Sequence, residues 1–449
     1  MRRPPGDQHA SRVRLRIPKA TMPFYWHAQA NEQIGLYQGK LYVADPKGRF
    51  ASNGAVTATW RPSPYIRADA SGPLKSRQLA NPFFTETSIQ LPSRVRLRKG
   101  LHVAAQPLVQ HDPPSFETST RESYRSIGRT HTRLDEVRFG LTNFPDVLGP
   151  VVRWPNGTGW RVRLEAPNHV VLLDARHDYS AVRDQLESEG GYALTHSGSL
   201  IPERPLAAKS IEKAIEALYF FLTFAAGRWT GPVLPVGLER GRPVWAQWDF
   251  RQLDAWGGTW SWFDRHDADA LPTLYPRFLA LWQDQEWRDA IRLAVAYWVL
   301  SNRPDPVQGA IVYAQVVLEM LAKRVLVTRG RLSRRAARGL DAGVLIATML
   351  QELAIDPAVP KQVPFLYRWA SRSRPRLDGP TVVARLRNRV IHGDRAHSEP
   401  PFRVWTDAWR LSTQYVELSL LAILGYQGRY SNRLLVDRWV GQTEPVPWV

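Results

Sequence analysis

The first 200 positions of the chain alternate apolar and polar residues in short stretches, and later positions change to a longer, helix-like spacing. Alternation with a period of two predicts β-strands. Turn signals such as Asp45-Pro46 and Pro155-Asn156-Gly157 separate the stretches. The strands predicted in this way are 12–17, 40–44, 55–60, 93–98 and 160–164. We therefore expect residues 1–200 to form a β-rich N-terminal domain.

Residues 201–270 combine a helix with a strand pair. A helix is predicted over 206–226, because Gly227 supplies a suitable residue after its C-terminus. Two strands follow at 233–238 and 243–248. Five tryptophans crowd into this part of the chain: Trp245, Trp248, Trp256, Trp260 and Trp262. They could stack nucleic-acid bases, but a small core under a loop is the preferred interpretation. We expect this region to connect the domains and to pack on the N-terminal domain.

From residue 271 the pattern predicts longer helices. They are 274–300, 307–328, 342–353, 363–370, 381–391 and 404–424. The helix 307–328 is apolar nearly all round, which is typical of the centre of a bundle. Its Glu319 would then need a partner. The predicted class is α+β, with the β-rich domain followed by an all-α bundle at 271–433 and an irregular tail at 434–449.

Charge favours a nucleic-acid partner. The 449 residues contain 60 Lys and Arg against 41 Asp and Glu, for a net charge of +19. The excess is densest in 271–449, where 25 bases face 15 acids. Two of the loops predicted there are rich in arginine and suit phosphate contacts or simple solvation. They contain Arg329, Arg331, Arg334, Arg335 and Arg338, and then Arg368, Arg372, Arg374 and Arg376.

Several classes of protein are excluded or disfavoured. The chain has no cysteine, so disulfides, thiolate metal sites and a cysteine nucleophile are excluded. No stretch reaches the roughly 18 apolar residues of a membrane span, and the Arg-rich N-terminus lacks the apolar core of a secretory signal. No Walker A, HExxH or GxSxG motif is present. We expect a cytoplasmic protein with no membrane partner, no metal and no cofactor.

The candidate chemistry lies in the stretch 378–397. Pro380 suits the first turn of a helix and Gly393 suits the position after its end. On this helix Arg387 falls inside the apolar arc, where a cation needs an anionic partner. That partner is either Glu319, in a structural salt bridge, or a substrate phosphate. Asn388 and His392 share the opposite, polar face.

The spacing Arg387-Asn388-x-x-x-His392 resembles the signature of the HEPN superfamily of helical ribonucleases. The apolar helix with Glu319 and the closing stretch 423–430 look like the ApeA-like branch, in which a β-rich domain precedes the bundle. The resemblance covers about 275–433. It implies a HEPN-like bundle with a metal-independent endoribonuclease activity that leaves a 2′,3′-cyclic phosphate.

The resemblance also implies roles and partners. His392 would be the general acid and base, Arg387 would stabilise phosphate charge, and Asn388 would orient them. The residues expected to contact RNA are Arg385, Arg389, Arg334, Arg335, Arg338, Arg372 and Arg374. RNA, with tRNA as one candidate, would be the substrate of a homodimer that joins through its helical domains. The N-terminal domain would sense a trigger, such as a phage protein, in antiviral abortive infection. The alternative is a catalytically silent module that binds RNA or a protein.

Overall fold

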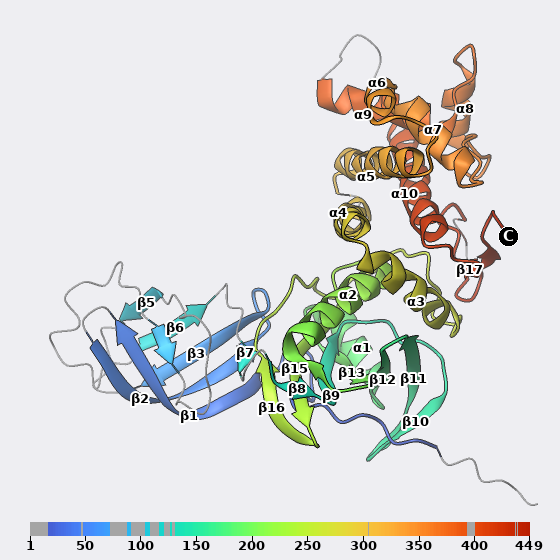
Figure 1. Cartoon of the computed structure of the whole chain (residues 1–449). Coiled ribbons are helices and arrows are strands. Elements are labelled where there is room, and N and C mark those ends of the chain that lie inside the picture. Colours follow the sequence, from blue (N-terminus) through green and yellow to red (C-terminus); the bar gives the residue numbers. More distant parts are fainter. Residues whose placement is uncertain are drawn as a thin grey trace, which may run out of the picture.

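The computed structural model confirms the predicted α+β class, with β-sheets in the N-terminal part and helices in the C-terminal part (Figure 1). It describes residues 17–45, 48–71, 88–90, 104–107, 116–120, 126–127, 131–303, 305–392, 400–435, 437 and 439–449.

The first sheet has the strand order β4-β1-β2-β3-β6-β5. Its strands are β1 (Ile34–Asp45), β2 (Gly48–Thr59), β3 (Tyr65–Ser71), β4 (Ser88–Gln90), β5 (Ala104–Pro107) and β6 (Phe116–Thr120). The predicted strands 40–44 and 55–60 fall in β1 and at the end of β2. The predicted strand 93–98 and all of 12–17 except Ile17 lie outside the described residues.

The second sheet has eight strands in the order β10-β11-β12-β13-β9-β15-β16-β7. Its strands are β7 (Ser126–Ile127), β9 (Glu136–Thr142), β10 (Val151–Trp154), β11 (Gly157–Ala166), β12 (His169–Ala175), β13 (Leu194–Pro202), β15 (Pro232–Glu239) and β16 (Arg242–Gln247). The β8 (Arg133–Leu134) and β14 (Leu206–Ala207) strands pair separately, and α1 (Tyr179–Glu189) and α2 (Ala208–Ala226) complete the region.

This second sheet crosses the boundary expected at residue 200. The β15 strand pairs antiparallel with β9, with Gly237 opposite Val137. The hairpin of β15 and β16 is therefore part of the same sheet as β9–β13, and not a separate connecting piece. A second hydrophobic cluster joins this sheet to the first, where Trp60 stacks on Tyr192 at 6.0 Å between ring centroids.

The clustered tryptophans divide between core and surface. Trp245, Trp248 and Trp262 are buried, which confirms the hydrophobic-core interpretation for these three. Trp260 is exposed, and Trp256 lies under the guanidinium of Arg228.

The helical part is built around α5 (Val307–Thr328), which contacts α4, α7, α9 and α10 as its all-round apolar pattern predicted. The other helices are α3 (Ala270–Gln283), α4 (Gln285–Ser301), α6 (Arg334–Gly339), α7 (Ala342–Glu352), α8 (Pro364–Ser371), α9 (Gly379–His392) and α10 (Phe402–Ile423). Among the described residues, no helix combines the length and the apolar character that crossing a membrane requires.

Three predictions in this part are wrong in detail. The single helix expected over 274–300 is two, because the Asp284 carboxylate accepts hydrogen bonds from the N–H groups of Glu286 and Trp287 and begins a new helix. The first arginine-rich loop contains α6. The tail is not wholly irregular: β18 (Glu444–Pro445) pairs with β17 (Arg429–Tyr430), and Val446 is buried.

A buried histidine links the second sheet to the helices. His169 at the start of β12 lies 2.8 Å from the Tyr275 hydroxyl on α3, and burial lowers the pKa of His169 to about 4. Above pH 6.5 this imidazole is neutral in the folded and the unfolded chain. As the pH falls from 6.5 towards 4, only the unfolded chain binds the proton, so stability decreases.

His169→Gln should therefore remove part of the acid sensitivity. We expect the loss of unfolding free energy between pH 7 and pH 5 to be smaller by about 1–2 kcal/mol in the variant. Denaturant unfolding at the two pH values measures the difference, with His177→Gln at an exposed histidine as the control. An unchanged pH dependence would contradict the assignment.

Candidate functional site

The candidate site lies on the last turns of α9. The Asp378 carboxylate accepts a hydrogen bond from the Thr381 N–H at 2.8 Å and caps the start of this helix. Val383 and Leu386 are buried against the bundle. Val390 and Ile391 are 40% and 51% exposed, although both side chains are apolar. The last turn of α9 therefore leaves two apolar side chains at the surface beside the site.

Arg387 binds Glu319 of α5. Its Nη2 donates a hydrogen bond to Glu319 Oε1, and its Nη1 donates to Asn388 Oδ1 at 3.0 Å. The two side chains of the ion pair are only 20% and 21% exposed. Arg387 is therefore paired with Glu319, one of its two expected partners, and Glu319 has the partner that its place in an apolar helix required. Whether Arg387 also binds a substrate phosphate stays a prediction.

The ion pair is at the edge of the core and is not isolated. Lys323, one turn further along α5, has its Nζ 4.0 Å from Glu319 Oε2. Arg387 Nε is buried and has no hydrogen-bond partner among the described residues. The Glu319 carboxylate thus faces two cations, Arg387 and Lys323. The Nε of Arg387 remains a hydrogen-bond donor without an acceptor among the described residues.

The remaining residues of the motif lie further along α9. Asn388 and Arg385 are exposed, and Arg389 is half-buried. His392 is the last residue of α9, and its side chain lies outside the described part of the structure. The catalytic role expected for His392 beside Arg387 therefore stays a prediction.

A pocket of about 680 Å³ opens between α4, α5 and α6. Four cations line it, namely Lys323, Arg324, Arg334 and Arg338, against the carboxylates of Glu286 and Asp289. Arg324 and Glu286 form an ion pair at 2.5 Å. The lining carries a net positive charge, and Lys323 connects it to Glu319 and so to Arg387.

The structure separates the arginines that were predicted to contact RNA. Arg334 and Arg338 line the pocket, whereas Arg335 is exposed on the same helix and does not. Arg372 and Arg374 are exposed in the loop between α8 and α9 and do not line the pocket.

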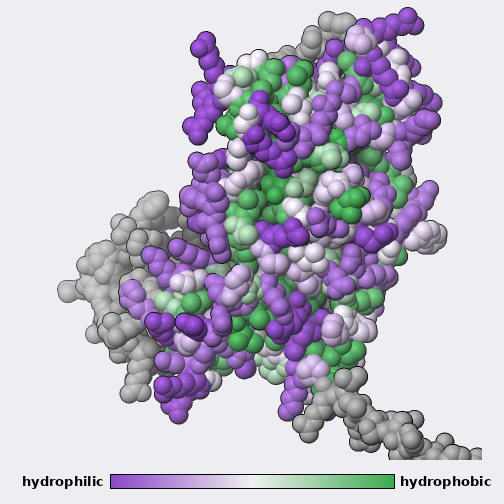
Figure 2. All heavy atoms as spheres, turned by 45° about the vertical axis from the view of Figure 1, so that its right-hand side comes forward, coloured by the Kyte–Doolittle hydropathy of each residue, from purple (hydrophilic) through white to green (hydrophobic). Residues whose placement is uncertain are grey.

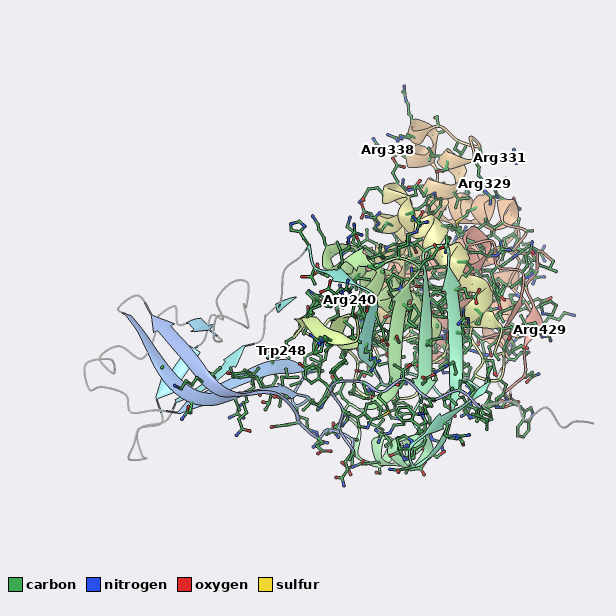
Figure 3. The ribbon with its side chains drawn as sticks, turned by 60° about the horizontal axis from the view of Figure 1, so that its bottom comes forward. Arg240, Trp248, Arg329, Arg331, Arg338 and Arg429 are labelled. Carbon is green, nitrogen blue, oxygen red and sulfur yellow. The ribbon has the colours of Figure 1, made fainter. Side chains whose placement is uncertain are left out.

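Other arginines of the two predicted loops have protein partners. Arg329 and Arg331 pair with Glu352 at 3.2 and 2.8 Å. These hydrogen bonds, with Arg331 first, lower the pKa of Glu352. Figure 3 shows Arg329, Arg331 and Arg338 at the outer end of the helical part, away from the sheets. Arg376 lies over the Tyr367 ring at 4.1 Å.

Sequence reasoning missed Lys323 and Arg324 as parts of the pocket. Both are on α5, the helix that was assigned to the centre of the bundle. Two adjacent bases near the end of an otherwise apolar helix are the signal that this end reaches the surface.

Fold and site together define a protein with a β-rich N-terminal part and a helical C-terminal part that carries a basic pocket. Residues 129–259 match the YopA central domain and residues 284–445 match the YopA C-terminal domain. The chain is 28% identical over 327 residues to the SPbeta prophage-derived uncharacterized protein YopA of Bacillus subtilis (strain 168). That alignment covers 71% of this chain and 73% of the relative. No solved structure matches the chain significantly.

Proposed function

We propose that the helical part of this chain is a metal-independent endoribonuclease of the HEPN type. The observation that carries the proposal is the motif at the end of α9, where Arg387 and Asn388 are joined by a hydrogen bond and His392 ends the helix. A histidine can transfer a proton near neutral pH, and an arginine can bind phosphate oxygens with two donors.

In the proposed cleavage of RNA, the nucleophile is a hydroxyl group of the RNA itself. The ribose 2′-oxygen attacks the adjacent phosphorus and gives up its proton, while the 5′-oxygen leaves and takes up a proton. The products are a 2′,3′-cyclic phosphate and a 5′-hydroxyl. His392 would transfer these protons, and Arg387 would stabilise the extra charge on the phosphorus oxygens. Arg387 would have to exchange Glu319 for the phosphate, with Lys323 left to hold the carboxylate.

The basic pocket is the proposed path of the RNA backbone. Arg334→Gln together with Arg338→Gln should weaken RNA binding and lower the slope of log affinity against log salt by about 1–2, because two phosphate contacts are lost. Filter binding from 50 to 200 mM salt measures this. Arg335→Gln is the matched control on α6, and an equal effect of the control would contradict the path.

The partners follow from the surface of the helical part. Figure 2 shows hydrophilic side chains over this part with hydrophobic ones exposed between them. Tyr313 and Val316 of α5 and Val390 and Ile391 of α9 are exposed apolar residues on the two helices that carry Glu319 and Arg387. We propose that they join two copies in a homodimer.

A cytoplasmic nuclease of this type would act in antiviral abortive infection, with its trigger bound by the N-terminal β-rich part. The prophage origin in the name of the relative supports a setting of conflict between phages and hosts.

The ion pair of Arg387 with Glu319 favours a second candidate, a catalytically silent module that binds RNA or a protein. Incubation of RNA with the wild type, His392→Ala and Arg387→Ala separates the two. Cleavage by the wild type alone supports the nuclease. Binding without cleavage favours the silent module, and equal cleavage by all three proteins would refute the site.

A further inference from the structure

A cavity of about 340 Å³ lies where the second sheet and its helices meet the segment that follows α10. Asp146 after β9, Arg183 on α1 and Arg228 after α2 contribute from the N-terminal side. Arg265 lies in the connection to α3, and Val440 comes from the C-terminal segment. The cavity is separate from the site on α9 and does not depend on the function proposed for it.

The cavity is lined by three arginines and three carboxylates, and the most deeply buried of these charged side chains is Arg228. The six residues are Arg183, Arg228, Arg265, Asp146, Glu187 and Asp264. Arg228 is only 5% exposed. Its Nη1 donates to the Gly257 carbonyl at 2.6 Å, and its Nη2 donates to the Asn143 carbonyl at 2.9 Å. Its guanidinium lies 4.5 Å from the centre of the Trp256 ring. Among the described residues no carboxylate forms an ion pair with Arg228. Two carbonyl groups and the Trp256 ring contact its guanidinium directly, and the Asp254 carboxylate acts on it from further away.

Four polar atoms of the lining residues are buried without a hydrogen-bond partner among the described residues. They are the Nε atoms of Arg183, Arg228 and Arg265 and the Oδ1 of Asp146. Arg265 and Asp146 approach each other only to 3.5 Å. Burial raises the pKa of Asp146, against the lowering effect of Arg265 and Arg183. Buried polar groups are paired in the great majority of native structures, so three donors and one acceptor together indicate a missing partner.

We propose that this cavity binds a small molecule that carries an oxyanion, either phosphate or carboxylate, and at least one hydroxyl group. The oxyanion would accept hydrogen bonds from Arg183, Arg228 and Arg265, and the hydroxyl would donate to Asp146. The volume of the cavity lies within the range of roughly 300–1,000 Å³ typical of small-molecule sites.

The cavity lies between the sheet region and the segment that follows α10, so a bound ligand would contact both. The Asp264 carboxylate, which also lines the cavity, accepts hydrogen bonds from the N–H groups of His266 and Gly441, each at 2.8 Å. Gly441 follows Val440 in the C-terminal segment. A ligand here therefore contacts both the sheet region and the segment after α10, and holds the two parts together.

Thermal unfolding of the full chain tests the site with two probes, ribose 5-phosphate and gluconate. The first offers a phosphate and the second a carboxylate, and both carry hydroxyls. At least one should raise the melting temperature of the wild type by about 2–4 °C at concentrations well above its dissociation constant. The probe with the larger shift identifies which oxyanion the site prefers.

Two variants attribute the shift to the cavity. Arg265→Gln and Arg183→Gln change partly exposed residues, and each should cut the shift to less than half of the wild-type value. Arg242→Gln, exposed on β16 and outside the cavity, should keep the full shift. The proposal is overturned if neither probe stabilises the wild type, or if both cavity variants respond as the wild type does.

Discussion

His392→Ala should reduce RNA cleavage by roughly 10²–10⁴-fold and leave RNA affinity nearly unchanged. The reason is that a general acid and base acts only in the proton-transfer steps, whereas affinity depends on the phosphate contacts of the arginines. Rates of cleavage and dissociation constants measured on the same RNA separate the two effects. A loss of affinity as large as the loss of rate would indicate a binding residue.

Arg387 and Glu319 give a sharper form of this test. Arg387→Ala should lower cleavage by roughly 10²–10³-fold, because the guanidinium that stabilises the phosphate charge is lost. Glu319→Gln breaks the ion pair but keeps Arg387, so cleavage should be retained or raised. If Glu319→Gln loses cleavage as completely as Arg387→Ala, the ion pair is structural and Arg387 does not touch the phosphate.

Arg433→Ala should destabilise the helical part by about 3–5 kcal/mol, because it leaves the buried Glu417 charge without its partner. The two side chains are 2% and 1% exposed, and Nη2 and Nε of Arg433 donate to the two Glu417 oxygens at 2.5 and 3.2 Å. This pair attaches the segment after α10 to that helix.

Denaturant unfolding measures the effect, and an exposed ion pair supplies the control. On β11, Arg163 Nε lies 2.7 Å from Glu165 Oε1, but both side chains are more than half exposed. Arg163→Ala should cost less than about 1 kcal/mol. Losses of equal size in Arg433→Ala and Arg163→Ala would contradict the account of the buried pair.

The parts of the fold that the sequence predicted well have strong local signals. The boundaries of α5 were predicted without error, because a long apolar run follows Pro306 and ends before Gly330. The break at Asp284 was missed because apolar spacing continues across it. The pairing of β9 with β15 was missed because it joins strands far apart in the chain, which no local pattern reveals.

At the site, too, features with a local sequence signal were predicted, and features that depend on the folded chain were missed. The partnership of Arg387 with Glu319 was one of two alternatives, because a cation in an apolar arc requires an anion. The exposure of Val390 and Ile391 was not predicted, because a helical pattern gives the faces of a helix but not the point where the bundle ends. The cavity around Arg228 was missed because its residues come together only in the folded chain.

The most direct test of the central claim is the chemistry of the RNA ends. Wild-type protein is incubated with an RNA oligonucleotide in the presence of EDTA, and the products are identified by mass spectrometry. We predict 2′,3′-cyclic phosphate and 5′-hydroxyl ends, and no cleavage where the 2′-hydroxyl is replaced by hydrogen. Products with 5′-phosphate ends, or cleavage that persists without the 2′-hydroxyl or in His392→Ala, would contradict the account.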